Sequence, residues 1–262
     1  MKINRDEIYA KTKEFLAERF WSIMIICLLI AVIEYGIDSI GGNGIVGKIG
    51  NILDELSKGN YIEVETLINA NANSNIIVVY LRVLVVTILN VGLSISILGA
   101  YRKNEKVSIS EGINAIKENF SKFIVAIIII TVSTTLISYI PPIGGVLAWI
   151  VEYSLAFSYF LIKDGKSPDA LSSIKDSYEQ TTGHKLNFFL IDLHYFLRVL
   201  ICISVVIIGS IIATPDMPSS GVVVMLLGIG TFFVLFIRYM IYSQTAMVIY
   251  YETLNEESNN DA

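Results

Sequence analysis

The chain has 262 residues, of which 54% are hydrophobic and only 16% are charged. Its mean hydropathy of +0.64 excludes an ordinary soluble domain and predicts an all-α polytopic membrane protein. The net charge of −5 and the lack of a basic stripe with interleaved aromatic residues argue against a nucleic-acid partner.

Six apolar runs are each long enough to cross a bilayer core of about 30 Å, which needs roughly 20 residues per helix. The third and fourth runs are separated only by Pro141 and Pro142, which cannot lie together inside a continuing helix, so they predict a helical hairpin. The sixth run is longer than one span requires. The runs cover residues 21–40, 76–100, 123–140, 143–162, 186–213 and 221–251.

The N-terminal segment does not resemble a cleaved signal peptide, because twenty residues of mixed charge precede the first apolar run. We therefore expect residues 21–40 to be an uncleaved anchor. Cys27 and Cys202 lie within predicted spans, where they are expected to be small apolar residues rather than a disulfide or a metal pair.

Each span that would enter the membrane from the cytoplasm follows a short amphipathic segment, at residues 4–20, 108–123 and 167–182. In the second segment, Ser108 and Glu111 match the SxxE capping box. The pattern predicts three cytoplasmic interfacial helices, and with them three modules of surface helix, inward-to-outward span and outward-to-inward span. The alternative is a set of ordinary basic in-plane helices with no repeat.

Helix-start and helix-stop residues support the other two surface helices. Asn4 is the expected cap of the first, while Ser167 and Pro168 should begin the third and Gly183 should end it. The predicted apolar stripes are Ile8, Phe15 and Phe20 in the first helix, Ile109, Ile113, Ile116, Phe120 and Phe123 in the second, and Leu171, Ile174 and Tyr178 in the third.

The distribution of positive charge predicts that both termini are cytoplasmic. Of the 19 lysines and arginines, three lie within spans (Arg82, Arg198 and Arg238), Lys48 and Lys58 fall outside, and the other 14 fall on the cytoplasmic side. The external connection, residues 41–75, carries a helical stripe that indicates either a helix on the outer surface or a partner-binding element.

Several short motifs in the second half of the chain point to one family. They are IPPIGG at 140–145, YSLAF at 153–157, ALSSIKDS at 170–177, GHK at 183–185, TA at 245–246 and YYE at 250–252. In these motifs the chain resembles the DUF975 family of bacterial integral membrane proteins. More distantly it is similar to YciC-type membrane proteins and to the membrane domain attached to some glycerophosphodiester phosphodiesterases. The resemblance implies a helical membrane protein of undefined activity, and the chain departs from the family pattern at His194 and Tyr195, where Ser-Phe is usual.

No catalytic motif is present in the sequence. It contains no HExxH, GxSxG, Walker loop or CxxC, and its two histidines, His184 and His194, are too few for a histidine-based metal site. We therefore expect a non-enzymatic protein without a cofactor or a metal.

Ionisable side chains within membrane spans are costly and are often functional. Counting about 1.5 Å per residue from the start of each span, three acid–base pairs match in depth. The pairs either neutralise one another as packing contacts, or surround a polar cavity that binds a ligand with Arg198 as its anion anchor. They are Glu34 with Arg82, Glu152 with Arg198, and Asp192 with Arg238.

These features together predict a multi-pass protein of the bacterial plasma membrane. The expected function is that of a scaffold or accessory subunit that contacts membrane lipids and a protein partner or a second copy of itself. The alternative is a small transporter-like or lipid-handling protein with a polar intramembrane cavity around Glu152 and Arg198.

Overall fold

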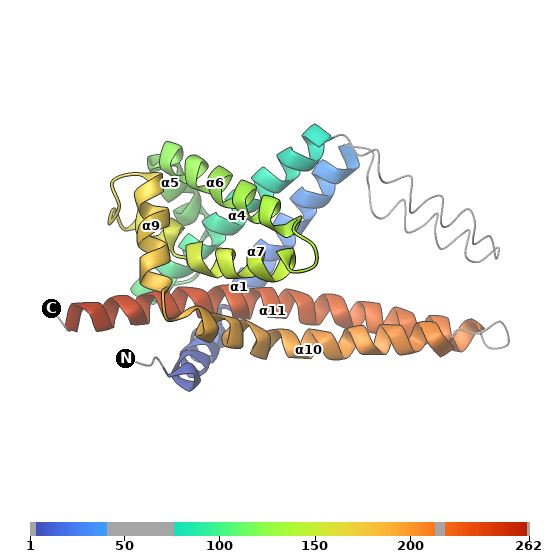
Figure 1. The fold of residues 1–262 in the computed structure, drawn as a ribbon. Helices are drawn as coiled ribbons and strands as arrows, with labels where there is room; N and C mark the ends of the chain where they lie inside the picture. Colours follow the sequence, from blue (N-terminus) through green and yellow to red (C-terminus); the bar gives the residue numbers. More distant parts are fainter. Residues whose placement is uncertain (1–3, 41–75, 213–217, 261–262) are drawn as a thin grey trace. The chain divides into compact units, whose positions relative to one another are not determined.

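The computed structural model describes residues 4–40, 76–212 and 218–260, and every structural statement below refers to these ranges. The described residues are almost entirely helical and include no strand. The helices, shown in Figure 1, are α1 (Arg5–Ile40), α4 (Ile76–Lys103), α5 (Ile109–Glu118), α6 (Phe120–Ser138), α7 (Gly144–Leu155), α8 (Ser158–Lys163), α9 (Ala170–Thr181), α10 (Lys185–Ile212) and α11 (Pro218–Asn260).

Within the described residues, five helical stretches are long and apolar enough to cross a membrane, which confirms the all-helical, membrane-type fold. The fifth predicted run falls in α10, a 28-residue helix that is not one of these five. The predicted external connection, residues 41–75, lies outside the described residues. The five stretches are Arg5–Ile37, Tyr80–Lys103, Phe120–Ser138, Gly144–Lys163 and Leu227–Glu256.

The chain divides into two compact units, Met1–Ile25 with Gly92–Ala262, and Ile26–Val91. The larger unit contains the first part of α1, the last part of α4 and all later helices. The smaller unit contains the rest of α1 and α4.

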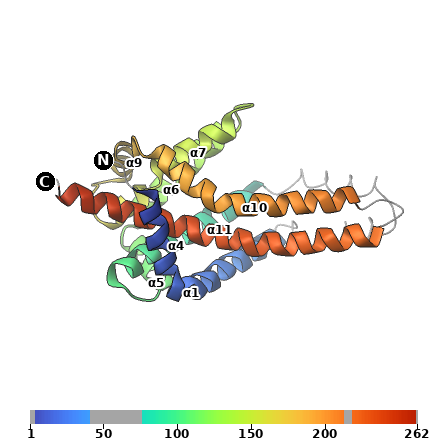
Figure 2. The same cartoon turned by 90° about the horizontal axis from the view of Figure 1, so that it is seen from below.

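In the larger unit, α10 and α11 lie side by side and antiparallel over most of their lengths (Figures 1 and 2). Aromatic side chains fill the core where this hairpin meets α7 and α8. The Phe188 ring lies 4.4 Å from the Tyr250 ring and 5.3 Å from the Phe157 ring, measured between centroids. Phe157 and Tyr250 are fully buried, so this aromatic cluster anchors the hairpin.

The fourth predicted span, residues 143–162, consists of two helices because the chain breaks between α7 and α8. Side chains of α9 replace the hydrogen bonds that are lost at the break. The backbone N–H of Phe157 donates to Ser177 Oγ at 3.1 Å, and the hydroxyls of Ser177 and Thr181 each donate to the Ser154 carbonyl at 3.0 Å. Buried backbone groups need partners, so α9 is a structural part of this interrupted span.

The expected apolar stripe of α9 lies on its outer side, where Leu171 is 65% exposed and Tyr178 is 53% exposed. The buried face consists of small residues instead: Ala170, Ser173, Ser177 and Thr181. The apolar stripe did not predict this inner face, whose hydroxyl groups supply the hydrogen bonds that the break in the neighbouring span requires.

The expected helix caps are formed only in part. Asn4 does cap α1, since its Oδ1 accepts the backbone N–H of Asp6 at 3.1 Å. Ser108 occupies the N-cap position of α5 but makes no side-chain cap bond. Its hydroxyl pairs with that of Ser110, and Glu111 instead binds Lys103 at 2.9 Å, so the capping box is absent from the described structure.

In the third surface helix the cap is Asp169, not Ser167. The Asp169 carboxylate accepts the backbone N–H of Ser172 at 2.8 Å, which lowers the pKa of Asp169. Ser167 lies outside the helix and donates to Asp176 at 2.6 Å. Gly183 ends the segment as predicted, with a φ of +88° that favours glycine.

The first surface helix and the first predicted span form one continuous helix, α1, of 36 residues. We expected two elements, but no residue in this stretch breaks the helix. In contrast, the second surface helix, α5, is separated from α6 at Asn119, whose φ of −121° and ψ of 35° are not helical.

The N-terminal part of α1 is tied to distant segments of the larger unit. Tyr9 stacks on His194 with 4.4 Å between ring centroids, and its hydroxyl donates to the Leu190 carbonyl at 3.5 Å. Arg19 is buried and donates from Nε to the Glu105 carbonyl and from an Nη to Asn104 Oδ1, both at 2.7 Å. The guanidinium group thus holds the segment that follows α4.

Helix α5 crosses α4 at a contact that only glycine permits. A Cβ on Gly112 would overlap the carbonyl oxygen of Gly92. Ser96 reinforces the crossing, because its Oγ donates to the Gly92 carbonyl at 2.8 Å and accepts the Gly112 N–H at 3.0 Å. The close approach explains why this surface helix lies firmly against the last part of α4.

Candidate functional site

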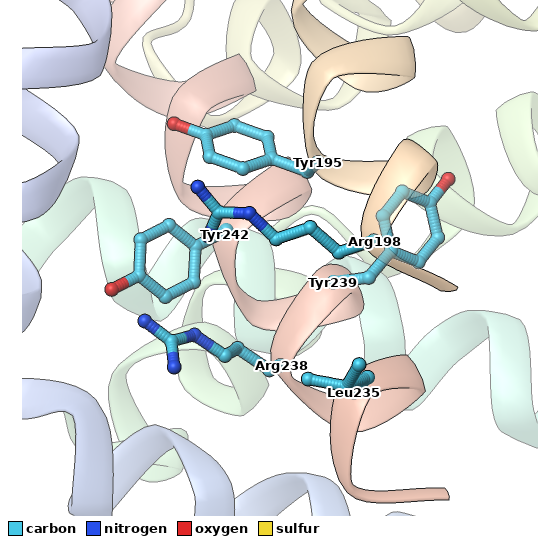
Figure 3. Close-up of a pocket in the computed structure, with 6 residues that line it drawn as sticks. All are labelled: Tyr195, Arg198, Leu235, Arg238, Tyr239 and Tyr242. Carbon is cyan, nitrogen blue, oxygen red and sulfur yellow. The ribbon is translucent and has the colours of Figure 1, made fainter. Parts of the chain in front are cut away.

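A shallow hollow on the α10–α11 hairpin brings two predicted site residues together. Arg198 of α10 and Arg238 of α11 lie on the same side of the hairpin, with the Tyr242 ring between their guanidinium groups (Figure 3). The space in the hollow that a water molecule can enter is about 10 Å³, so the hollow is shallow. Its lining is Tyr195, Arg198, Leu235, Arg238, Tyr239 and Tyr242.

The register of the hairpin brings the two arginines to one level. Tyr195 packs on Tyr242 with 5.3 Å between ring centroids, and Phe196 packs on Tyr239 at 5.4 Å. Since helical neighbours lie three or four residues apart, these contacts place Arg198 beside the turn that carries Arg238. Aromatic packing, which apolar periodicity alone does not specify, therefore builds the hollow.

Neither arginine has an acidic partner among the described residues, and both side chains are exposed. Arg238 lies over the Tyr242 ring, 5.3 Å from its centroid, which is a cation–π contact. Such a contact leaves the guanidinium N–H groups free to donate, so the hollow presents donors of two guanidinium groups on one face.

The opposite side of the hairpin carries an acid with a full set of donors. Asp192 Oδ2 accepts the hydroxyls of Tyr153 and Tyr239, each at 2.9 Å, and Oδ1 accepts the Ser243 hydroxyl at 2.5 Å. The donors come from α7 and α11, so this carboxylate joins three helices. Tyr239 also lines the basic hollow, but its hydroxyl points away from the arginines (Figure 3).

Two of the three expected acid–base pairs are therefore not formed. Glu152 is exposed and makes no ion pair or hydrogen bond with the described residues, so it does not neutralise Arg198. Asp192 binds hydroxyl groups rather than Arg238. Depth was counted from the ends of apolar runs, but α11 has 43 residues, or about 64 Å, and is too long for one end to fix its level.

The third pair, Glu34 with Arg82, stays a prediction. Both side chains are half-buried, Glu34 on α1 and Arg82 on α4, and both belong to the smaller unit.

A second polar cluster, which the sequence did not reveal, lies at the ends of α4 and α8. Arg102 makes a bidentate contact with Asp164 at 2.7 and 2.8 Å and binds Glu252 at 2.6 Å. Tyr251 donates to Asp164 at 2.8 Å. Burial alone would raise the pKa of Asp164, but the hydrogen bonds from Arg102 and Tyr251 outweigh it and lower that pKa.

The sequence gives only weak signals for the cluster of Arg102, Asp164 and Glu252. Arg102 and Glu252 are 150 residues apart, and each has the ordinary sequence context of a charge at the end of an apolar run. Only their positions at cytoplasmic ends of predicted spans could have suggested a common level.

Within the described ranges, no group of three His, Cys, Asp or Glu side chains gathers closely enough to hold a metal ion. The hydroxyl-bound Asp192 and the cluster of Arg102 with two acids are saturated by their own neighbours, whereas the basic hollow is not. The arrangement is therefore suited to binding an anion at Arg198 and Arg238. Comparison of the chain with protein-family models, with curated proteins and with solved structures finds no match in any of the three.

Proposed function

We propose that the chain is a non-enzymatic protein of the bacterial plasma membrane that acts as a lipid-contacting scaffold or accessory subunit. In this proposal it has six spans, with α10 as the fifth, and both termini are cytoplasmic. The proposal includes its kinship with the DUF975 family, which the motifs at 140–145 and 170–177 suggest.

The observation that carries the proposal is the exposure of aromatic side chains close to where surface helices meet spans. Trp21 in α1 is 68% exposed, Phe120 at the start of α6 is 58% exposed and Tyr178 in α9 is 53% exposed. Trp21 and Phe120 stand where a surface helix meets a span, and Tyr178 lies in the last turn of the third surface helix. Amphipathic aromatic rings favour the headgroup level of a bilayer, where such exposure is stabilising rather than costly.

The outward face of α9 supports the same conclusion. Besides Leu171 and Tyr178 it carries Lys175, whose side chain is 76% exposed, and Lys185 lies 4.0 Å from the centre of the Tyr178 ring. Glu179 on the same face lies 3.8 Å from Lys175, so the face combines apolar side chains with a charged pair, which suits a helix that lies at a membrane interface.

The hollows of the described residues favour a scaffold over the transporter-like alternative. The hollows at Arg198 with Arg238 and at Asp192 with Ser243 each have about 10 Å³ of space that a water molecule can enter, room for about one water. A drug-sized ligand site usually needs roughly 300 Å³ or more. Their shallow form is more consistent with contacts to lipids than with a translocation path.

Tryptophan fluorescence can test the lipid contact, because the chain has only two tryptophans, Trp21 and Trp149. In the Trp149→Phe protein, reconstituted in vesicles, we expect Trp21 to be quenched most strongly by phospholipids brominated near the headgroup. The matched control is Trp21→Phe, in which Trp149 should be quenched more strongly by bromine placed deeper in the chains. Quenching of Trp21 by aqueous iodide but not by brominated lipid would overturn the proposal.

The topology can be tested by thiol labelling of intact cells after Cys27 and Cys202 are replaced by alanine. A cysteine at Ser57 should react with an impermeant reagent and a cysteine at Ser172 should not, because of the lysine and arginine distribution. Labelling at Ser172 in sealed cells would contradict the cytoplasmic placement of α9.

A further inference from the structure

We propose that the hollow formed by Arg198 and Arg238 binds the phosphate group of an anionic phospholipid of the inner leaflet. This inference rests on the proposed function, since it assumes that the α10–α11 hairpin spans a membrane. It assigns a binding site to residues that make no ion pair among the described parts of the chain.

The chemistry of the hollow selects a phosphate. Two guanidinium groups face the same side, and each presents planar donors that match phosphate oxygens in a bidentate manner (Figure 3). The Tyr242 ring between them holds Arg238 by a cation–π contact and limits the direct approach of the two positive charges. An anion in the hollow would be shared by both groups, which removes their mutual repulsion.

The level of the hollow matches the inner leaflet. If Ile212, the last residue of α10, lies at the outer face, Arg198 is 14 residues or about 21 Å below it, and the aromatic contacts of the hairpin place Arg238 at the same level. In a hydrocarbon slab of about 30 Å both arginines then lie in the inner third. Long arginine side chains extend from this depth to the phosphate layer.

The surroundings of the hollow select a lipid rather than a free anion. Ile201 follows Arg198 by three residues on α10, and Val234 precedes Arg238 by four on α11, so each lies on the same helix face as its arginine but closer to the membrane centre. Both are 66% exposed. A phosphate held by the arginines would thus place an acyl chain along these apolar side chains.

Native mass spectrometry of the full-length protein in mild detergent tests the site, with phosphatidylglycerol, phosphatidylcholine and inorganic phosphate as separate probes. We expect phosphatidylglycerol to bind the wild-type protein in preference to phosphatidylcholine. The Arg198→Gln/Arg238→Gln double variant should bind phosphatidylglycerol at least about tenfold more weakly, because charge-assisted bonds from two arginines are lost. Phosphatidylcholine binding should not change.

A matched control removes two exposed lysines elsewhere, as Lys106→Gln/Lys117→Gln, and should leave phosphatidylglycerol binding unchanged within about twofold. Arg198→Lys keeps the charge but loses the planar fork, so intermediate binding is expected even if the double variant folds poorly. Equal phosphatidylglycerol binding by wild-type and the double variant would overturn the inference. Release of phosphatidylglycerol by inorganic phosphate at a concentration similar to that of the lipid would also overturn it, since the hollow would then bind the free anion.

The inference and the proposed function fail in different ways. Loss of lipid selectivity with normal quenching of Trp21 by brominated lipid contradicts only the phosphate site. Absence of that quenching in the Trp149→Phe protein with both arginines in place contradicts membrane contact itself, whatever the arginine variants show.

Discussion

The two sides of the α10–α11 hairpin differ in whether their charged side chains have partners within the chain. On one side Asp192 receives three hydroxyl hydrogen bonds from α7 and α11. On the other, Arg198 and Arg238 have no acidic partner in the described part of the chain. A charged residue at the centre of a membrane helix costs about 2.5–3.5 kcal/mol by insertion measurements, so each side needs compensation. The chain supplies it for the acid, and we infer that the membrane supplies it for the arginines.

The comparison teaches how to separate structural from functional charges in a membrane protein. A group whose hydrogen bonds are all made within its own chain contributes to stability, so its replacement should lower the free energy of unfolding. Replacement of a group with unfilled hydrogen-bonding capacity should change the free energy of unfolding little and weaken ligand binding strongly.

The largest effect on stability is expected for Asp192→Ala, which leaves the hydroxyls of Tyr153, Tyr239 and Ser243 without their acceptor. At about 0.6–1.5 kcal/mol for each lost bond, the loss should reach about 2–4 kcal/mol. Asp192→Asn retains one carbonyl oxygen, so its stability should lie between that of wild type and that of Asp192→Ala. Thermal unfolding in detergent measures this difference, and a value for Asp192→Ala within 0.5 kcal/mol of wild type would break the comparison.

A second satisfied group tests whether hydroxyl compensation is general in this protein. Ser177→Ala removes the acceptor of the buried Phe157 N–H and a donor to the Ser154 carbonyl, so we expect a loss of about 1–2 kcal/mol. Ser172→Ala is the control, since its hydroxyl is bonded only to exposed Asp169 and its capping N–H is retained. Similar unfolding temperatures for both variants would show that the α7–α8 break does not depend on α9.

The cluster of Arg102 and Asp164 gives a pH test of intermediate size. Because the pKa of Asp164 is lower in the folded protein, its ion pair stabilises the fold above pH 4 or so, and this contribution is lost as pH falls through the lowered pKa. Asp164→Asn should therefore be less stable than wild type by about 1 kcal/mol at pH 7, with the difference shrinking below about pH 4.

The control for the pH test is Glu179→Gln, which removes only a 3.8 Å contact with Lys175 between two well-exposed side chains. Its stability should follow that of wild type at every pH. A difference between Asp164→Asn and wild type that stayed constant from pH 7 to pH 3 would rule out the titration of Asp164 as its cause.

The smallest effect on stability is expected for Arg198→Gln and Arg238→Gln. Neither variant breaks an ion pair among the described residues, so unfolding in detergent should change by no more than about 0.5 kcal/mol. The same variants should lose phosphatidylglycerol, and this divergence between stability and binding sharpens the comparison with Asp192. A large loss of stability in lipid-free detergent would assign the arginines to the structural class.

The helices could be predicted from the sequence because each apolar run is a local property. Apolar runs as long as 76–100 and 186–213 are typical only of a membrane-spanning or buried helix, and α4 and α10 lie there. The side that faces the protein could not be predicted for α9. In a lipid environment apolar side chains gain nothing by facing inward, and the small hydroxyl residues Ser173 and Ser177 pack there instead.

The charged residues of the site were recognised from the sequence, but their partners were not. Partners depend on the register between α10 and α11, which aromatic contacts such as Tyr195 with Tyr242 determine. One local signal was present: Tyr239 and Ser243 are four residues apart, so they mark a single polar face in an otherwise apolar run. That face is the one that binds Asp192.

The contact between Tyr9 and α10 also has a consequence for biosynthesis. The Tyr9 hydroxyl binds the Leu190 carbonyl, 181 residues later in the chain. At about 5–20 residues per second, roughly 10–40 seconds separate the emergence of the two partners from the ribosome. During this interval Tyr9 has neither the Leu190 carbonyl nor the His194 ring on which it stacks in the finished protein. The contact of α1 with α10 can therefore form only after most of the chain has been made.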